Sequence, residues 1–233
     1  MSEGGLLGVL GGMGPESTVY FFSKIVKLTE AKRDQDHIPI LIYNYPQIPD
    51  RTLAYMGAGD SPLPYLIAGI RKLEDAGSSI IAIPCNSAHL WINELKINAR
   101  AEILNMIELT VNKFTAGDKV GLLATTLTVN SRLYEEPLKK RGVQVLLPEN
   151  QDFVMDQIRR IKGGMIEEAR RALLPVAYDL IEKGVSHILL GCTEIPLAIG
   201  REDIGVPLVD PMEILARECI VKMGGKLRKE YSI

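Results

Sequence analysis

Two cysteines stand at matching places in the chain and are the residues best suited to chemistry. Cys85 follows the apolar run 79–83 and a proline, and Cys192 follows the apolar run 187–191. A thiolate can act as a base or as a nucleophile. Each cysteine has a glycine eight positions before it, and the two cysteines are 107 residues apart (85 to 192). The repeated order of glycine, strand, cysteine and polar residue predicts two related halves that each supply one thiol.

Each cysteine is expected where a strand ends and a helix begins. Short apolar runs bounded by turn residues are typical of buried parallel strands. Gly77 and Gly184 each follow an amphipathic helical stretch and are typical of the residue just past a helix end. Ligands of open α/β sheets bind at the carboxyl ends of strands. A helix N-terminus favours negative charge, so we expect a thiol there to ionise more easily.

Three kinds of chemistry fit such a cysteine pair. A redox pair or a metal site usually needs close spacing, such as Cys-x-x-Cys, which is absent here, and the three histidines are not clustered. A single nucleophile needs a base, and His89 could serve Cys85, although a helix-surface histidine is the more ordinary interpretation. The third is a pair of acid/base thiols on opposite faces of one carbon, which inverts a stereocentre. For Cys219, inside the last helix, we expect a buried small hydrophobe.

The first glycine loop, Gly11-Gly12-Met13-Gly14-Pro15, links an expected strand at 6–10 to an expected helix at 15–31. It lacks the third glycine of the dinucleotide fingerprint, because Ser17 stands there, and no acidic residue ends the next strand. These features argue against NAD binding. A loop whose backbone N–H groups face a carboxylate at a helix N-terminus fits the sequence better.

Two cations are candidates for holding a carboxylate. Arg51 lies in a long connection, rich in proline and glycine, that runs to about Pro64. Loops of such length are usually functional or disordered, and a guanidinium can form two parallel hydrogen bonds to a carboxylate. A solvent-exposed loop arginine without a ligand is, however, the more ordinary interpretation. Lys162 ends the helical stretch 151–162, where it could bind a ligand or simply complement the helix dipole.

Composition places the chain among ordinary globular proteins. It has 233 residues, of which 46% are hydrophobic and 24% charged, and a net charge of −2 without a basic stripe, which argues against nucleic-acid binding. No apolar run reaches the ~18 residues of a membrane helix, and the N-terminus does not resemble a signal peptide. Three cysteines argue against a disulfide framework. We therefore expect a cytoplasmic protein with free thiols.

Strands and helices alternate along the whole chain, which predicts an α/β fold with parallel sheets. A break at 115–118 divides the two halves. The last helix, from Met212, is expected to return to the first half. The expected domains are residues 1–115 with 208–233, carrying Cys85, and residues 116–207, carrying Cys192.

Three motifs resemble those of the cofactor-independent aspartate/glutamate racemase superfamily, specifically its aspartate racemase branch. They are Gly11-Gly12-Met13-Gly14-Pro15, Pro84-Cys85-Asn86-Ser87-Ala88-His89 and Gly191-Cys192-Thr193-Glu194. The likeness runs from about Leu6 to the C-terminal helix. It implies two similar flavodoxin-like or Rossmann-like domains related by a pseudo-two-fold axis. It also implies an active site in the cleft between them and no PLP or metal.

The resemblance further implies that Cys85 and Cys192 are the two bases that interconvert L- and D-aspartate. Arg51 and Lys162 match the positions that bind the side-chain carboxylate. Ser87 stands where threonine is usual and keeps the hydroxyl. The α-carboxylate and ammonium would be held by Met13, Gly14, Asn86, Ser87, Thr125 and Thr193. We also expect a homodimer, which an apolar helix such as 92–103 could form.

Other functions stay open at this point. Glutamate, or a broader range of amino acids, could be the substrate. A related enzyme could isomerise or decarboxylate a dicarboxylate such as maleate through one nucleophilic cysteine, and a covalent thioether adduct would favour this. A two-lobed protein that binds small acids is the non-enzymatic alternative, and turnover of a bound acid would exclude it.

Overall fold

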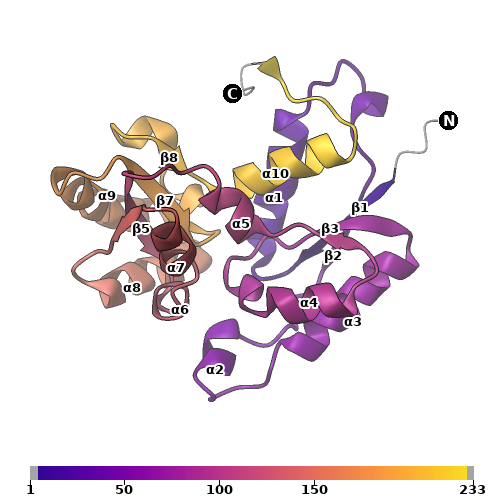
Figure 1. The fold of residues 1–233 in the computed structure, drawn as a ribbon, viewed down its shortest axis with the longest axis horizontal. Coiled ribbons are helices and arrows are strands. Elements are labelled where there is room, and N and C mark those ends of the chain that lie inside the picture. The colour runs from indigo at the N-terminus through magenta and orange to yellow at the C-terminus, as the bar shows by residue number, and fades with distance from the viewer. Residues whose placement is uncertain (1–4, 230–233) are drawn as a thin grey trace. The chain divides into compact units, whose positions relative to one another are not determined.

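The computed structural model describes residues 5–229 as an α/β protein with two four-stranded parallel sheets (Figure 1). Packing divides the chain into two compact units. The first contains residues up to Met106 and from Met212 onward, and the second contains Ile107–Pro211. The α/β prediction is confirmed, and the ends of the expected first domain, 1–4 and 230–233, lie outside the described residues.

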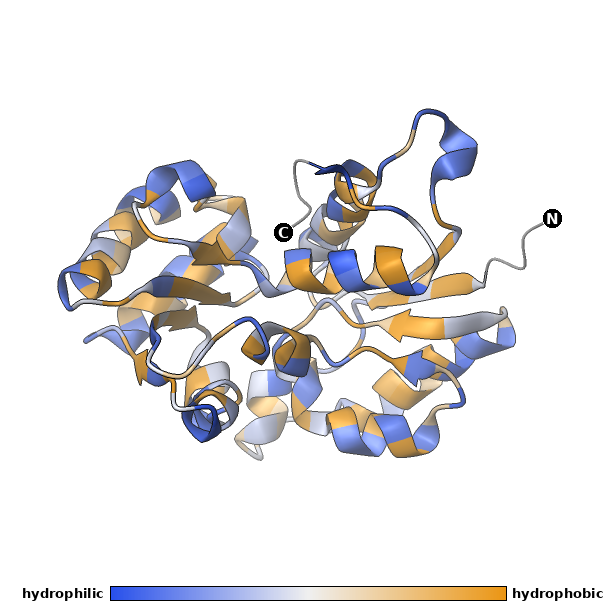
Figure 2. Cartoon of the chain, turned by 45° about the horizontal axis from the view of Figure 1, so that its top comes forward, coloured by the Kyte–Doolittle hydropathy of each residue, from blue (hydrophilic) through white to orange (hydrophobic). Residues whose placement is uncertain are grey.

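The sheet of the first unit has the order β2-β1-β3-β4, with all pairs parallel. Its strands are β1 (Leu6–Gly11), β2 (Ile40–Asn44), β3 (Ser78–Ala82) and β4 (Glu102–Ile103). Parallel strands need long crossover connections, which are usually helices. Four helices of this unit are α1 (Pro15–Leu28), α3 (Leu63–Asp75), α4 (Ile92–Asn98) and α10 (Pro211–Lys222). Figure 2 shows the strands as mainly hydrophobic and the helices as mixed, as expected for a sheet covered by amphipathic helices.

Helices cover the first sheet with apolar side chains. Leu10 and Ile81 pack against Leu66 and Ile70 of α3 and Leu95 of α4 in one core cluster. Figure 1 draws α1 and α10 side by side, and the ion pair from the Lys24 Nζ to the Glu213 Oε2 joins them at 3.1 Å. The last helix therefore returns to the first unit, as predicted from the sequence.

The sheet of the second unit repeats the same strand order, β6-β5-β7-β8, and is also parallel. Its strands are β5 (Lys119–Ala124), β6 (Gln144–Leu146), β7 (His187–Gly191) and β8 (Leu208–Val209). Counted within each unit, both orders are 2-1-3-4, the pattern at the start of flavodoxin-like sheets. The predicted relation between the halves therefore holds at the level of topology.

Successive side chains along the strands of the second sheet pack in two separate hydrophobic cores. Leu123 and Ile188 pack in a cluster with α8 and α9, whereas their neighbours Leu122 and Leu189 pack in a cluster with α5 and α7. This period of two is what a sheet buried on both faces requires. The helices of this unit are α5 (Met106–Val111), α6 (Thr126–Asn130), α7 (Glu135–Lys140), α8 (Gln151–Lys162) and α9 (Ile166–Glu182, which continues through Pro175).

The limits of the two units differ from the expected domain limits at residues 107–115 and 208–211. Ile107 and Phe114, in and after α5, belong to the same core cluster as Leu122 of β5. Leu208 of β8 pairs with Ile188 of β7. Both segments are therefore part of the second unit.

Short helical segments differ most from the sequence expectations. The connection after β2 contains α2 (Arg51–Tyr55), whose start is capped by the Asp50 carboxylate through the N–H groups of Thr52 and Leu53. After Cys85, where the sequence predicts the start of a helix, the chain instead forms a 3₁₀ turn, η2 (Ser87–Trp91), followed by α4. Gly77 and Gly184 adopt φ of +96° and +84° directly after the C-cap residues of α3 and α9, so their predicted role at helix ends is confirmed.

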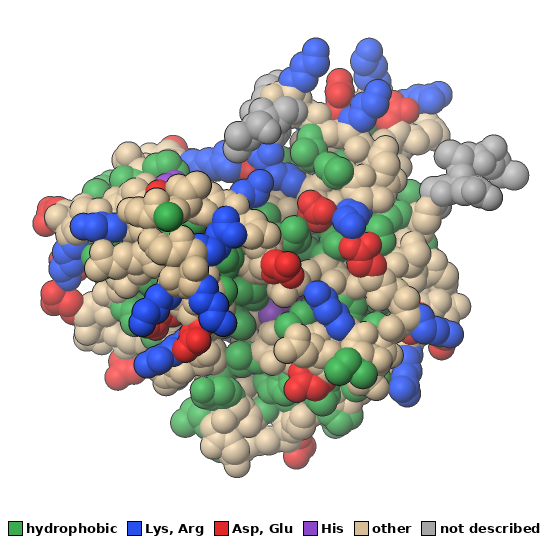
Figure 3. Space-filling model, viewed as in Figure 1, with side chains coloured by type: hydrophobic (Ala, Val, Ile, Leu, Met, Phe, Trp, Pro, Cys, Tyr) green, Lys and Arg blue, Asp and Glu red, His purple; other side chains and the backbone are tan. Residues whose placement is uncertain are grey.

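On the face shown in Figure 3, basic and acidic side chains are interspersed. Within residues 5–229 no helix is both long enough and apolar enough to cross a membrane. The same residues contain no group of three or more His, Cys, Asp or Glu side chains that could hold a metal ion.

Candidate active site

Cys85 and Cys192 occupy equivalent positions in the two units. Both are free thiols and nearly fully buried, with 3% and 4% of their surfaces exposed. Cys85 follows β3, which lies beside β1, and Cys192 follows β7, which lies beside β5. The chain changes direction across the sheet between these strands, and such switch points are where open α/β sheets bind ligands. Each unit therefore places one thiol at its own switch point.

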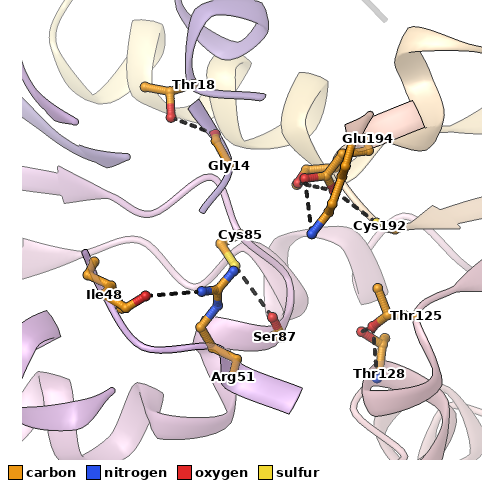
Figure 4. A network of polar contacts seen from close by, with 12 residues as sticks. Gly14, Thr18, Ile48, Arg51, Cys85, Ser87, Thr125, Thr128, Cys192 and Glu194 are labelled. Carbon is orange, nitrogen blue, oxygen red and sulfur yellow. Dashed lines mark hydrogen bonds and ion pairs between the residues drawn. The ribbon is translucent and has the colours of Figure 1, made fainter. Parts of the chain in front are cut away.

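The Cys85 loop is fixed by its backbone and lined by one hydroxyl. The Cys85 N–H donates to the carbonyl of Ile83 at 2.8 Å, and the Sγ lies 3.5 Å from the Ser87 Oγ (Figure 4). Met13 and Ile48 belong to the same core cluster as Cys85. The loop after β1 and the segment before α2 thus both contribute side chains to the core cluster that contains Cys85.

Arg51, the first residue of α2, is held by main-chain carbonyls. Its Nη1 donates to the carbonyl of Pro49 at 3.1 Å and is 3.5 Å from that of Ile48, and its Nε is buried without a hydrogen-bond partner among the described residues. Helix α2 contacts η2, the turn that follows Cys85. This guanidinium therefore stands near the Cys85 loop with donors left for a carboxylate.

The first glycine loop is braced by a side chain of the helix it starts. The Gly12 N–H donates to the Thr18 Oγ1 at 2.9 Å, and that hydroxyl donates to the Gly14 carbonyl at 3.1 Å. Gly12 has φ of +93°, and a Cβ there would lie 2.4 Å from the carbonyl carbon of Tyr45. The Gly12 N–H is thus taken by Thr18 and does not face a ligand carboxylate, contrary to our expectation for this part of the loop.

His89 is neither a surface residue nor a base for Cys85. Only 2% of it is exposed, its Nδ1 lies 2.8 Å from the Cys85 carbonyl oxygen, and its Nε2 accepts from the Met106 N–H at 3.2 Å. Burial lowers the pKa of His89. Both ring nitrogens are engaged with the backbone, which corrects both interpretations made from the sequence.

In the second unit, Cys192 belongs to a polar cluster around Glu194. The Cys192 thiol donates to the Glu194 Oε2 at 3.0 Å, the Thr193 hydroxyl donates to the same oxygen at 3.2 Å, and the Lys162 Nζ lies 3.6 Å from the Oε1 (Figure 4). Glu194 is 5% exposed. Glu194 belongs to the motif Gly191-Cys192-Thr193-Glu194 but was not predicted as a site residue. The sequence feature that could have indicated this role is an acidic residue two positions after Cys192.

The Cys192 sulfur is held as a neutral thiol. Burial raises the pKa of Cys192 well above its ordinary value, the negative charge of Glu194 raises it further, and Lys162 opposes this. The expected easing of ionisation by a helix N-terminus does not occur here. Only a 3₁₀ turn, η3 (Ile195–Leu197), follows the cysteine, so few peptide dipoles align with it, and a carboxylate stands beside the sulfur.

Thr125 directly follows β5, as Gly12 directly follows β1. Its Oγ1 caps α6 by accepting from the Thr128 N–H at 3.2 Å. Ala124 pairs with Gly191 in the sheet, so Thr125 and Cys192 leave neighbouring strands from paired positions. The Gln151 Nε2 donates to the Ala124 carbonyl at 2.9 Å, which brings the start of α8 to the same edge.

The predicted site residues therefore form two sets, one at each switch point. Asn86 is buried and Ser87 half-buried beside Cys85, and Thr193 is buried beside Cys192, whereas Lys162 is exposed. The first set is Met13, Gly14, Arg51, Cys85, Asn86 and Ser87, and the second is Thr125, Lys162, Cys192 and Thr193. Cys219 is fully buried in α10, and burial raises its pKa, so its predicted role as a core residue fits.

Fold and site together define a two-unit α/β protein in which matching loops each present a buried thiol. The family model described as Asp/Glu/Hydantoin racemase matches residues 10–219. The chain therefore belongs to the Asp/Glu/Hydantoin racemase family, and it is an enzyme of the racemase class of isomerases.

Individual relatives agree with this assignment. The solved structure of the Picrophilus torridus aspartate racemase is 37% identical, with a TM-score of 0.90 over 98% of both chains. The broad specificity amino-acid racemase RacX of Bacillus subtilis is 29% identical over 92% of this chain and 96% of its own length. A Francisella tularensis glutamate racemase, solved with D-glutamate, shares the fold at 19% identity and a TM-score of 0.65, over 95% of this chain and 81% of its own.

Proposed function

We propose that this enzyme interconverts L- and D-aspartate without PLP, using Cys85 and Cys192 as the two acid/base groups at the α-carbon. One observation chiefly supports the proposal: a buried free cysteine follows the third strand of both sheets. The 37% identity with an aspartate racemase over nearly the whole chain supports aspartate as the substrate.

The proposed reaction transfers one proton off the α-carbon and another onto it. A thiolate removes the α-proton, the C–H electron pair remains on the carbon and spreads into the carboxylate, and the other thiol gives its proton to the opposite face. One S–H bond forms and one breaks, so charge and atoms balance, and the reverse reaction exchanges the two roles. Because the α-hydrogen is a very weak acid, hydrogen-bond donors fixed in advance must stabilise the developing charge.

Glu194 is the proposed positioning residue for Cys192. Its Oε2 accepts the thiol hydrogen, which orients the sulfur, while Thr193 and Lys162 hold the carboxylate. Cys192 is protonated in this arrangement, so it suits the role of the thiol that returns a proton. The Cys85 sulfur has a hydroxyl neighbour instead of a carboxylate, which suits it to the complementary role.

Arg51 and Lys162 are the proposed partners of the substrate's side-chain carboxylate. A guanidinium fixed by two carbonyls loses little further freedom when it binds, and it retains donors in a fork suited to a carboxylate. The α-carboxylate and ammonium would then meet the loops that hold Met13, Gly14, Asn86, Ser87, Thr125 and Thr193.

The test is racemisation of each aspartate enantiomer in heavy water, followed by chiral chromatography and mass spectrometry. We expect the wild-type enzyme to form the other enantiomer with one solvent deuterium at the α-carbon, and Cys85→Ser and Cys192→Ser each to lose at least about a hundredfold in kcat. Carbonyl reagents and chelators should leave the wild-type rate unchanged. Wild-type racemisation by either serine variant would overturn the two-base proposal.

A broader substrate range is the second candidate. It is favoured by the similarity to the broad specificity racemase of Bacillus subtilis. A panel of enantiomerically pure amino acids separates the two candidates, because a dedicated aspartate racemase should act on aspartate far faster than on glutamate or on neutral residues.

A further inference from the structure

His89 holds the carbonyl group of the proposed catalytic Cys85 from inside the first unit. The ring lies one turn beyond the cysteine in η2 and is 2% exposed. A carbonyl only accepts and a backbone N–H only donates, so the contact to Cys85 requires a hydrogen on Nδ1, and the contact from Met106 requires a lone pair on Nε2. The neutral Nδ1–H tautomer satisfies both contacts.

The two groups that this ring joins belong to segments leaving neighbouring strands. Cys85 follows β3, and Met106 follows β4 and begins α5. The strands are paired through Ile81 and Ile103. The imidazole therefore spans the two loops at the carboxyl edge of the first sheet, where backbone groups have no partners from the ladder.

A peptide group is planar, so fixing its carbonyl also fixes its N–H. The carbonyl of Cys85 and the N–H of Asn86 belong to one peptide and point in opposite directions. The Cys85 N–H is itself held by the Ile83 carbonyl at 2.8 Å. With both sides of the Cys85 backbone bound, the sulfur retains mainly the rotation about its own Cα–Cβ bond.

We propose that His89 is a positioning residue for the racemase reaction, acting as a neutral strut whose two hydrogen bonds set the orientation of the Cys85–Asn86 peptide. This inference rests on the proposed catalytic role of Cys85. The direction of the pKa agrees with it. Burial lowers the pKa of His89, and the carbonyls of Cys85 and Leu104 oppose this only in part.

Two substitutions separate the two hydrogen bonds of the ring. In His89→Asn the amide nitrogen takes the place of Nδ1, which keeps the bond to Cys85 and loses the one from Met106. In His89→Gln the longer amide reaches the place of Nε2, which keeps an acceptor for Met106 and releases the Cys85 carbonyl. Each variant removes one buried hydrogen bond, so a comparable loss of stability is expected from both.

Kinetics and thiol chemistry then distinguish positioning from mere packing. We expect His89→Gln to lower kcat by about tenfold or more with little change in KM, because a small misplacement of a reacting group is costly, and His89→Asn to retain most of kcat. The alkylation rate of Cys85, resolved by peptide mass spectrometry, should change in His89→Gln alone. Equal effects of the two variants on kcat, or a wild-type kcat in His89→Gln, would overturn the proposal.

Nitrogen-15 spectra of histidine in the wild-type protein provide a test that needs no substrate. We expect Nδ1 to be protonated and Nε2 unprotonated at neutral pH, with no further protonation of the ring within the pH range in which histidine ordinarily titrates. A ring that titrates in this range, or carries its hydrogen on Nε2, contradicts the strut. If the spectra and the alkylation rates agree with the strut but no amino acid is racemised, the proposed function fails and the assignment of the ring stands.

Discussion

At the scale of residues, the two thiols have unlike electrostatic surroundings despite their matching positions. Cys192 shares its hydrogen with a buried carboxylate, whereas Cys85 faces the Ser87 hydroxyl. A two-base reaction needs one thiol and one thiolate, and two identical sulfurs would have no built-in preference for either form.

The first prediction concerns the charges beside Cys192. Glu194 raises the pKa of this thiol and Lys162 lowers it. In Glu194→Gln the pKa of Cys192 should fall, and iodoacetamide should react with Cys192 at lower pH than in the wild type. In Lys162→Met the pH dependence of Cys192 alkylation should move to higher pH. Peptide mass spectrometry measures the alkylation of Cys192 separately, and buried Cys219 is the unreactive internal control. If the pH dependence of Cys192 alkylation moves in the same direction in both variants, this electrostatic account is contradicted.

The second prediction concerns Arg51 and the substrate's side chain. Arg51→Lys keeps the charge but loses the planar fork, so KM for aspartate should rise about tenfold or more, with a smaller effect on kcat. Asparagine or another neutral amino acid with measurable turnover is the matched control, because its KM should hardly change. An equal rise in KM for both substrates would mean that Arg51 supports the loop and does not bind the carboxylate.

At the scale of elements, α3 and the segment before β4 are joined by a buried carboxylate. The Glu74 side chain of α3 accepts from the Ala101 N–H at 2.8 Å and from the Arg100 Nε at 3.2 Å. It is 4% exposed although Arg100 itself is largely exposed. Burial alone would raise the pKa of Glu74, but these donors and the charge of Arg100 hold it below its ordinary value.

The third prediction is that Glu74→Gln lowers the free energy of unfolding by about 1–3 kcal/mol near neutral pH. A carboxyl whose folded pKa is depressed stabilises the fold above its unfolded pKa of about 4.3 and loses that effect as pH falls through the folded value. The deficit of the variant should therefore shrink in acid. Denaturant unfolding measures it, and Asp75→Asn, which changes the exposed partner of Arg100, should have little effect at any pH.

Regular elements were predictable because their signals are local. The apolar runs of β3 and β7 and the glycines after α3 and α9 mark strands and helix ends without knowledge of the fold. The short α2 and α6 were missed because five residues carry no helical periodicity, and tertiary contacts decide whether they form. Chemical type and motif spacing were enough to propose both cysteines as site residues. The roles proposed for His89 and Glu194 depend on contacts that spacing does not encode, with Met106 and with Lys162.

At the scale of the whole molecule, each unit has its own sheet, its own cores and one of the two cysteines. A two-base site therefore requires that both units of one chain, or units of two copies, contribute to each site. Each hydrophobic core lies within one unit, whereas the proposed reaction needs residues from both units.

The fourth prediction decides between these two arrangements. If both thiols of a site come from one chain, an equimolar mixture of Cys85→Ser and Cys192→Ser, refolded together, should remain as inactive as either variant alone. If units of two copies share a site, about a quarter of the wild-type activity should return by random pairing. Chiral chromatography of the mixture measures this, with wild type diluted into either variant as the control for refolding yield.

Helix α10, which follows residues 107–211 in the sequence, packs in the unit that contains β1, whereas residues 107–211 form the other unit as one continuous segment. During synthesis on the ribosome, the continuous unit can complete its core while the earlier-made unit still waits for its last helix. The half that carries Cys192 is thus able to mature first, and the half that carries Cys85 closes only after α10 has been made.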